Sequence, residues 1–344
     1  MGGKMGPFTL PSPARYFPPH TGRYDVAPGL KPLGTPFGNG AADERLFQID
    51  TGFAEYRQNK QACRAERLTK YVVQDALPPA VSTAVADFLA ARFAAEYPSL
   101  FLLRRESDGS GTLHCRLAGE RLRFDGQMGL AGVHGAPAAV PPYASAFDAL
   151  CMQVPEDVAV VCTSPERGDW IAALHLCSPS HWGAEAKAGK SFADAHAPVP
   201  GMAKVNAAAA ALMEAMIYKG PWVRFVWGFG ADRRLNHHPE PPPGVLADVW
   251  RGQALDPAGR PPFFLRVERQ CLWGLPEVDA AIFTIRISFV DGEAIRANAV
   301  ERSQLCAALR SMTPESRRYK NVAERADEII TWLETGPHSP PSPA

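Results

Sequence analysis

The feature that most constrains the fold is a series of apolar, strand-like segments in the middle of the chain, separated by short turn signals. Residues 157–163 and 170–177 are rich in small and β-branched apolar residues, and only the turn Ser164–Gly168 separates them. Three more strand-like segments follow, at 222–229, 263–273 and 280–290. Because a short turn joins antiparallel neighbours, this order predicts a mostly antiparallel sheet, and the sequence has no GxGxxG or Walker loop of a nucleotide-binding fold.

Segments with helical spacing lie on both sides of these strands. The pair Pro78-Pro79 opens a run over 80–97, in which Val81, Val85, Phe88 and Leu89 form one apolar stripe with Phe93 at its edge. Further helices are expected at 53–73, 144–153, 204–218, 299–311 and 322–333, and shorter strands at 100–103 and 113–124. We therefore predict an α+β fold with one central antiparallel sheet flanked by helices.

The ends of the chain differ in composition from its middle. Residues 1–45 are rich in Pro and Gly, which predicts an N-terminal arm that lies on the surface or is flexible. We expect residues 46–335 to form a single domain, since this length is sufficient for one large core. Residues 336–344 predict a disordered tail.

Charge and hydropathy argue against two classes of function. The 36 Lys and Arg residues balance the 36 Asp and Glu residues, whereas a general nucleic-acid binder or a binder of acidic membranes usually needs a basic surplus. No segment approaches the roughly 20 consecutive apolar residues of a membrane span. We therefore expect neither a nucleic-acid partner nor a membrane.

Cysteine usage indicates the compartment. The seven cysteines are scattered, their number is odd, and no pair has CxxC spacing. This predicts small core residues in a reducing compartment, rather than a disulfide framework or a zinc site, and hence a cytoplasmic protein. The first 24 residues contain Lys4, Arg15 and Arg23 but no acid, so an organelle transit segment remains an open alternative.

His196 is the histidine with the most suggestive surroundings. Lys187 and Lys190 precede it, and Pro198 and Pro200 restrict the chain that follows it. A neutral imidazole held in one direction is a suitable axial ligand for haem iron, and the two lysines could meet the anionic haem propionates. A histidine that only bonds a loop carbonyl is the commoner outcome of such a context, so both interpretations stay open at this point.

The strand-like segment at 263–273 carries an unusual row of charges. In a strand, Arg266, Glu268 and Gln270 would face one side, and Val267 and Arg269 the other. Charges among apolar neighbours are costly to bury unless they are paired or bind a ligand. The row therefore indicates either a pocket, with an arginine on a propionate and a carboxylate near a cationic amine, or an edge strand with solvated charges.

Two further polar groups indicate structure rather than chemistry. Glu156 and Asp157 follow Pro155 at the start of a predicted strand, which predicts a turn with exposed acids. The adjacent His237 and His238 lie in a Pro-rich loop. Neighbouring side chains point apart, so we do not expect this pair to bind a metal.

Taken as a set, these segments resemble the signatures of the haem-dependent oxidative N-demethylase α-subunit family. The first signature comprises Ser-Pro-Ser-His-Trp at 178–182, Lys-Ala-Gly-Lys at 187–190 and His-Ala-Pro-Val-Pro at 196–200, preceded by the acidic pair Glu156-Asp157. The second comprises Arg-Val-Glu-Arg-Gln-Cys-Leu at 266–272, Leu-Pro at 275–276 and Phe-Thr-Ile-Arg at 283–286. The resemblance covers about residues 45 to 335 in the same order. Each motif is moderately specific, and the set is specific.

The resemblance implies a fold, a cofactor and an activity. The fold would be PAS-like, and the cofactor would be haem b. The activity would be oxidative N-demethylation of a small secondary amine by O2 with release of formaldehyde, supplied with electrons by an external flavin/NADPH reductase. Carried over by position, His196 becomes the axial metal ligand, Lys187, Lys190 and Arg269 cofactor-binding residues, and Glu268 and Arg266 catalytic residues.

The chain departs from the family pattern at two places. Arg234-Leu-Asn236-His237 stands where the family usually has Asn-Trp after an arginine, and Val154-Pro155 separates Gln153 from Glu156. Both changes could reshape the pocket, so the resemblance does not identify the amine. A PAS-like haem sensor, another non-catalytic haem-binding module, or a scaffold without haem are the alternatives of a different class.

Overall fold

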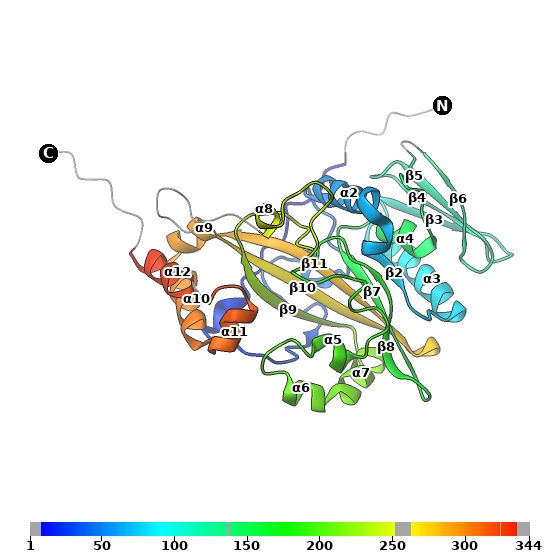
Figure 1. The fold of residues 1–344 in the computed structure, drawn as a ribbon. Helices are drawn as coiled ribbons and strands as arrows, with labels where there is room; N and C mark the ends of the chain where they lie inside the picture. The colour runs from blue at the N-terminus through cyan, green and yellow to red at the C-terminus, as the bar shows by residue number, and fades with distance from the viewer. Residues whose placement is uncertain (1–7, 136–137, 252–262, 324, 336–344) are drawn as a thin grey trace.

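The computed structural model describes residues 8–135, 138–251, 263–323 and 325–335. Its largest element is a seven-stranded antiparallel sheet in the order β1-β9-β10-β11-β7-β8-β2 (Figure 1). The strands of this large sheet are β1 (Lys31–Pro32), β2 (Val72–Gln74), β7 (Asp157–Ser164), β8 (Gly168–His175), β9 (Trp222–Gly230), β10 (Phe264–Leu275) and β11 (Ala280–Asp291). The five strands β7 to β11 are those predicted from the apolar segments, and the α+β class is confirmed.

A second, smaller sheet lies apart from the large one. It has four strands in sequence order, β3 (Phe101–Arg105), β4 (Gly111–Cys115), β5 (Glu120–Phe124) and β6 (Leu130–His134). The expectation of one sheet was therefore incomplete, and the single strand predicted at 113–124 is wrong. The chain reverses between β4 and β5, where Gly119 has a φ of 71° that a residue with a side chain rarely adopts.

Helices cover the sheets on several sides. They are α1 (Ala41–Glu44), α2 (Phe53–Tyr71), α3 (Pro79–Glu96), α4 (Ala146–Cys151), α5 (Phe192–His196), α6 (Ala203–Ala207), α7 (Ala209–Tyr218), α8 (Ala247–Arg251), α9 (Gly292–Ala297), α10 (Ala299–Ser311), α11 (Pro314–Tyr319) and α12 (Ala326–Glu334), with the 3-10 turns η1 (Pro18–Thr21) and η2 (Pro276–Val278). The α3 stripe of Val81, Val85 and Leu89 is buried as predicted. The helix expected at 204–218 is divided into α6 and α7. Within the described residues, no helix combines the length and apolar character needed to cross a bilayer.

The two faces of the large sheet have different covers. We name them by side chains of β10: the Glu268 face and the Arg269 face. On the Glu268 face lie α5, α6 and α7, below the sheet in Figure 1, where Phe192 and Met213 pack against Leu272. The Arg269 face is covered by α3 and α4 at one end and by α9, α10 and α12 at the other.

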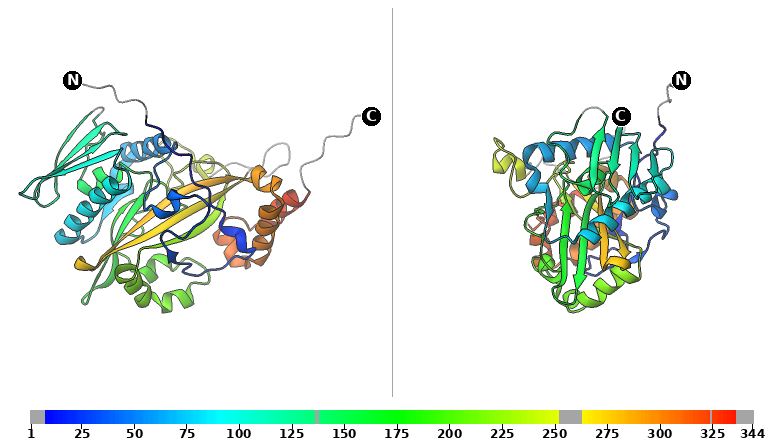
Figure 2. Two further views of the ribbon diagram at one scale, coloured as in Figure 1. Left: turned by 180° about the vertical axis from the view of Figure 1, so that it is seen from behind. Right: turned by 90° about the vertical axis from the view of Figure 1, so that its right-hand side faces the viewer.

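The N-terminal segment also lies on the Arg269 face. Seen from behind, its dark-blue chain crosses β10 and β11 (Figure 2). β1 pairs with β9, Tyr16 packs against Phe225, and Arg15 forms an ion pair with Glu301 of α10. Residues 8–45 of the predicted arm therefore pack against β9 and α10, while residues 1–7 and the predicted tail at 336–344 lie outside the described residues.

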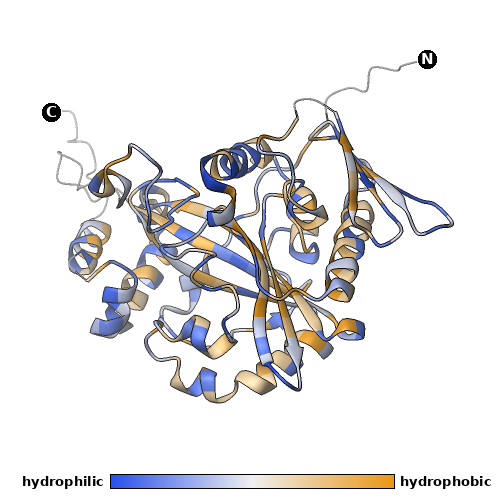
Figure 3. Cartoon of the chain, turned by 45° about the vertical axis from the view of Figure 1, so that its right-hand side comes forward, coloured by the Kyte–Doolittle hydropathy of each residue, from blue (hydrophilic) through white to orange (hydrophobic). Residues whose placement is uncertain are grey.

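Helix α2 is mostly hydrophilic, whereas the strands of the large sheet are mostly hydrophobic (Figure 3). Nevertheless α2 buries the cationic side chains of Lys60, Arg64 and Lys70. Lys60 donates hydrogen bonds to the carbonyl oxygens of Cys151 and Val154. A buried cation must be compensated by hydrogen bonds or charges. Lys60 and Arg64, which pairs with Asp148, therefore dock α2 onto the chain that leads into β7, whereas Lys70 pairs with Glu66 and donates to the carbonyl oxygen of Glu240.

The seven cysteines are all buried and unpaired. This confirms the expectation of small core residues without a disulfide framework.

Candidate functional site

Strand β10 forms the centre of the candidate site because it sends a polar row to one face of the large sheet. Arg266, Glu268 and Gln270 lie on this face, as the alternation of a strand requires. Glu268 pairs in register with Val226 of β9 on one side and Ile287 of β11 on the other. Although strands flank it on both sides, its side chain remains partly exposed, so this part of the face is not sealed.

The carboxylate of Glu268 is held by two hydrogen bonds. The hydroxyl of Ser180 donates to Oε1 over 2.6 Å, and the amide of Gln270 donates to Oε2 over 2.8 Å. Both partners are themselves fixed, Gln270 by the strand and Ser180 by its loop. The direction of the carboxylate is therefore set before any ligand arrives.

Arg266 joins two loops to the strand. Its Nε donates to the Ser180 hydroxyl over 2.8 Å, and its NH2 donates to the carbonyl oxygens of Ser178 at 2.7 Å and Leu235 at 2.9 Å. Its NH1 donates to the carbonyl oxygen of Arg234 at 3.1 Å. The guanidinium is 4% exposed, and its donors are occupied by protein groups, so it positions Ser180 and Glu268.

Arg269 lies on the opposite face from Glu268. Its NH2 donates to the carbonyl oxygen of Arg45 over 2.7 Å, with longer contacts to those of Asp43 and Leu46. The side chain is 2% exposed. Arg269 therefore anchors the N-terminal segment, and the structure separates it from the other residues predicted for the site.

His196 ends α5 on the Glu268 face. Ser191 begins this helix, where its hydroxyl accepts the amide hydrogen of Asp194. The Nδ1 of His196 lies 2.8 Å from the carbonyl oxygen of Phe192. Because a carbonyl only accepts, Nδ1 carries the proton and Nε2 keeps a lone pair. Burial lowers the pKa of His196 to about 4, which leaves the imidazole neutral at physiological pH.

Lys187 connects the preceding turn to α5. Its ammonium donates to the carbonyl oxygen of Ala195 over 2.8 Å and lies 4.6 Å from the centre of the Trp182 ring. Burial lowers the pKa of Lys187 to about 8, and Glu268 opposes this shift. Lys190 lies on the same turn with an exposed side chain. The structure thus brings Lys187, His196 and Glu268 to one face of the sheet.

His181 is a residue of this face to which the sequence analysis assigned no role. Its backbone has a φ of 65°, which is uncommon for a residue with a side chain and recurs at functional sites. The amide of His181 donates to the carbonyl oxygen of His237, and the two rings lie 5.2 Å apart. Desolvation of the ring, together with the neighbouring His237 and Arg266, lowers the pKa of His181, although the residue as a whole is exposed. Within the described part of the chain, its ring nitrogens make no hydrogen bond, so a lone pair is available here too.

Apolar side chains surround Glu268 and are also partly exposed. They are Trp182, Val226, Phe283 and Phe289. Trp182, Phe283 and Phe289 pack against a buried cluster that includes Ile287. The site is therefore an apolar, partly open surface with a fixed carboxylate in it and neutral histidines on the same face.

The prediction that Glu156 and Asp157 are exposed is wrong. Glu156 is buried and accepts the amide hydrogen of Gln48 over 2.7 Å. Asp157 is buried and accepts the amide hydrogens of Cys177 at 2.8 Å and Ser178 at 2.7 Å. These partners lie far away in sequence, so the local pattern could not indicate them. Asp157 thereby holds the start of the Ser178–His181 loop from below.

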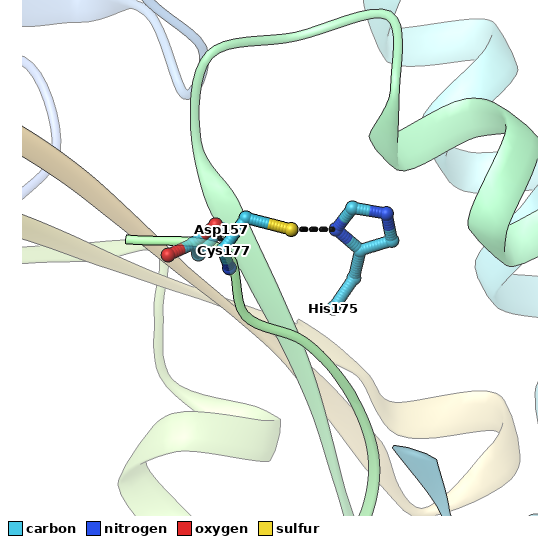
Figure 4. A group of neighbouring side chains, drawn as sticks. All are labelled: Asp157, His175 and Cys177. Atoms are coloured by element: carbon cyan, nitrogen blue, oxygen red, sulfur yellow. Dashed lines mark hydrogen bonds between the residues drawn. The ribbon is translucent and has the colours of Figure 1, made fainter. Parts of the chain in front are cut away.

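A second group of reactive side chains lies behind this loop (Figure 4). The ring of His175 is directed at the sulfur of Cys177, with 3.9 Å between Nδ1 and Sγ, and Asp157 lies beside them. The Nε2 of His175 is 3.3 Å from Asp148. The order Cys-His-Asp resembles a nucleophilic triad. However, all four side chains are buried, and burial raises the pKa of the Cys177 thiol well above its usual value, so the group is closed to substrates.

The site and fold define an α+β protein in which a neutral histidine and a fixed carboxylate share one face of an antiparallel sheet. The chain belongs to the haem-dependent oxidative N-demethylase, alpha subunit-like family, whose model matches residues 39–330. The match includes every site residue described above and confirms the resemblance noted in the sequence.

The burial of Glu156 leads to a pH-dependent stability. Burial raises the pKa of Glu156 to about 7 from 4.5, so the folded chain keeps a proton that the unfolded chain releases. Between these pH values the folded state binds more protons, and the free energy of unfolding falls as the pH rises. For Glu156→Gln, which cannot ionise, we expect stability relative to the wild type to increase by roughly 3 kcal/mol over this range.

Urea unfolding at pH 5 and pH 7.5 measures this difference. Glu277→Gln, at an exposed position, provides the baseline. If the difference between Glu156→Gln and the wild type is the same at both pH values, Glu156 does not retain its proton in the folded state.

Proposed function

We propose that this protein is an oxidoreductase that binds haem b on the Glu268 face and carries out oxidative N-demethylation of a small secondary amine with O2. The observation that carries this proposal is His196, a neutral imidazole whose Nδ1 is bonded to a carbonyl, so that Nε2 is available as an axial ligand. Family membership supports the haem. Bound haem would supply the redox chemistry with dioxygen.

The residues present fit such a cofactor. A haem needs a neutral nitrogen donor, an apolar surface for its ring and cations for its two propionates. His196 is the donor, and the partly exposed Trp182, Phe283 and Phe289 are the apolar surface. Arg224 of β9 has a buried Nε without a hydrogen-bond partner among the described residues, which suits an anionic group that the chain itself does not supply.

The roles of the polar residues follow from their hydrogen bonds. Glu268 binds the substrate ammonium or accepts its proton, since its carboxylate is oriented by Ser180 and Gln270. Arg266 keeps this carboxylate and the Ser178–His181 loop in place. Lys187 and Lys190 are candidate contacts for the anionic edge of haem, whereas Arg269 contributes by anchoring the N-terminal segment.

The remaining features of the proposal concern the whole chain. Residues 46–335 act as one domain with a PAS-like sheet, and formaldehyde is released along with the demethylated amine. The electrons come from an external flavin/NADPH reductase, and the protein works in the cytoplasm. Membership of the haem-dependent oxidative N-demethylase, alpha subunit-like family supports this chemistry.

Turnover tests the proposed activity. The haem-loaded chain, given an N-methylated secondary amine and a reducing system, should consume O2 and release formaldehyde in proportion. Glu268→Gln should keep its haem spectrum and lose roughly 100-fold or more in rate, in the range expected for loss of an acid–base group. O2 or CO binding without formaldehyde release from any amine would instead favour a haem sensor.

Two matched variants test the iron ligand. We expect His196→Ala to lose haem or to show a shifted Soret band, because no other group of α5 can replace the Nε2 donor. We expect His181→Ala to retain haem content and the position of the Soret band. The opposite result, with an unchanged spectrum for His196→Ala and a changed one for His181→Ala, would transfer the ligand role to His181.

A further inference from the structure

Two cations on the Glu268 face, Arg224 and Lys320, make no hydrogen bond or ion pair in the described part of the chain, and the ammonium of Lys320 lies 5.7 Å from the centre of the Tyr319 ring. Arg224 lies on β9, where it pairs in register with Gln270 of β10. The next residue of β9 on the same face is Val226, which pairs with Glu268. Lys320 follows α11 and reaches back over the sheet, where its Cδ lies 3.7 Å from the position of a Cβ built on Gly228. Because Gly228 has no side chain, it leaves room for the lysine stem. The Nε of Arg224 is buried.

Burial makes this lack of partners unfavourable. Burial lowers the pKa of Arg224 and of Lys320, and Glu268 is the acid that opposes both shifts. Glu268 makes no hydrogen bond with either cation among the described residues, and its carboxylate is held instead by Ser180 and Gln270. The buried Nε of Arg224 has no acceptor among the described residues, and such a donor is rarely kept unless a ligand or water completes it.

The other cations near Glu268 are already in use. Lys187 donates to the carbonyl of Ala195, and Arg266 donates to Ser180 and to several loop carbonyls. Lys190 is exposed to solvent, so Arg224 and Lys320 are the two half-buried cations of this face that lack a hydrogen-bonding partner among the described residues. A guanidinium and an ammonium both form charge-assisted hydrogen bonds with carboxylates, so a carboxylate ligand fits these two side chains.

Arg224 and Lys320 reach this face from two different segments, β9 and the chain after α11, so a ligand with two carboxylates can engage both. The backbone positions of Arg224 and Gly228, over which the Lys320 stem lies, are four residues apart on one strand, or roughly 13 Å, and the two long side chains can approach each other more closely than this. We infer that Arg224 and Lys320 bind the two propionate carboxylates of haem. This inference rests on the proposed haem function and adds two residues that no sequence motif indicated.

Binding of haem and of its uncharged dimethyl ester to the full-length chain tests the inference. The two porphyrins differ only at the propionates, so the ratio of their affinities, followed by the Soret band, reports the carboxylate contacts. We expect the wild type to prefer haem at least tenfold. Arg224→Gln and Lys320→Met should each reduce this preference several-fold, and Arg224→Lys should keep more of it than Arg224→Gln.

Arg318→Gln is the matched control, because Arg318 is exposed on the same helix that precedes Lys320. It should leave the preference unchanged. Lys320→Met keeps the apolar stem over Gly228, so it also tests the inference if Arg224→Gln does not fold. Circular dichroism identifies such a folding failure.

Three other results would each contradict part of the proposal. Equal binding of haem and ester by the wild type, or an unchanged preference in both variants, would overturn the propionate contacts while leaving the haem function intact. If the variants instead weakened binding of an N-methylated amino acid and left the porphyrin preference unchanged, the two cations would serve a substrate carboxylate. Failure of the wild type to bind either porphyrin would contradict the proposed function itself.

Discussion

The arrangement of the site depends on the hydrogen bonds of one buried guanidinium, that of Arg266. It is joined at once to the Ser180 hydroxyl and to carbonyl oxygens of the loops at Ser178 and Leu235. A guanidinium offers five N–H donors in one plane, whereas a lysine ammonium offers only three, so a lysine could not make the same set of bonds. Because Ser180 in turn donates to Glu268, the same set of bonds fixes both the loop and the direction of the carboxylate.

The alternation of β10 separates the chemical and the architectural roles. Arg266 and Glu268 lie on the face that carries His196, Lys187 and His181. Arg269, one residue away from Glu268, lies on the other face and binds the carbonyl oxygen of Arg45. Adjacent charged residues of one strand thus serve different purposes, and the N-terminal segment closes the Arg269 face while the Glu268 face stays partly open.

The sequence predicted those elements whose residue pattern lies within the element itself. The stripe of α3 and the two hairpins β7–β8 and β10–β11 depend on spacing and turn residues within the segments themselves. The alternation of Arg266, Glu268 and Arg269 across the sheet also follows from strand geometry. His196 could be selected because its neighbours, the two lysines and two prolines, lie within a dozen residues.

The features that could not be predicted depend on partners far apart in the chain. Glu156 and Asp157 resemble turn residues until Gln48 and Ser178 are folded against them. Lys320 reaches the site from a C-terminal segment almost a hundred residues after Arg224, where its stem lies over Gly228. Single residues without a motif, such as these, become visible as site candidates through their missing partners rather than through their sequence.

The most direct test of this account is the amount of haem bound by the full-length chain when it is expressed with an adequate haem supply. The pyridine haemochrome spectrum of the purified protein measures this quantity against the protein concentration. We expect about one haem b for each chain, with a Soret band from the bound porphyrin. A colourless protein that also fails to take up added haem would contradict the account.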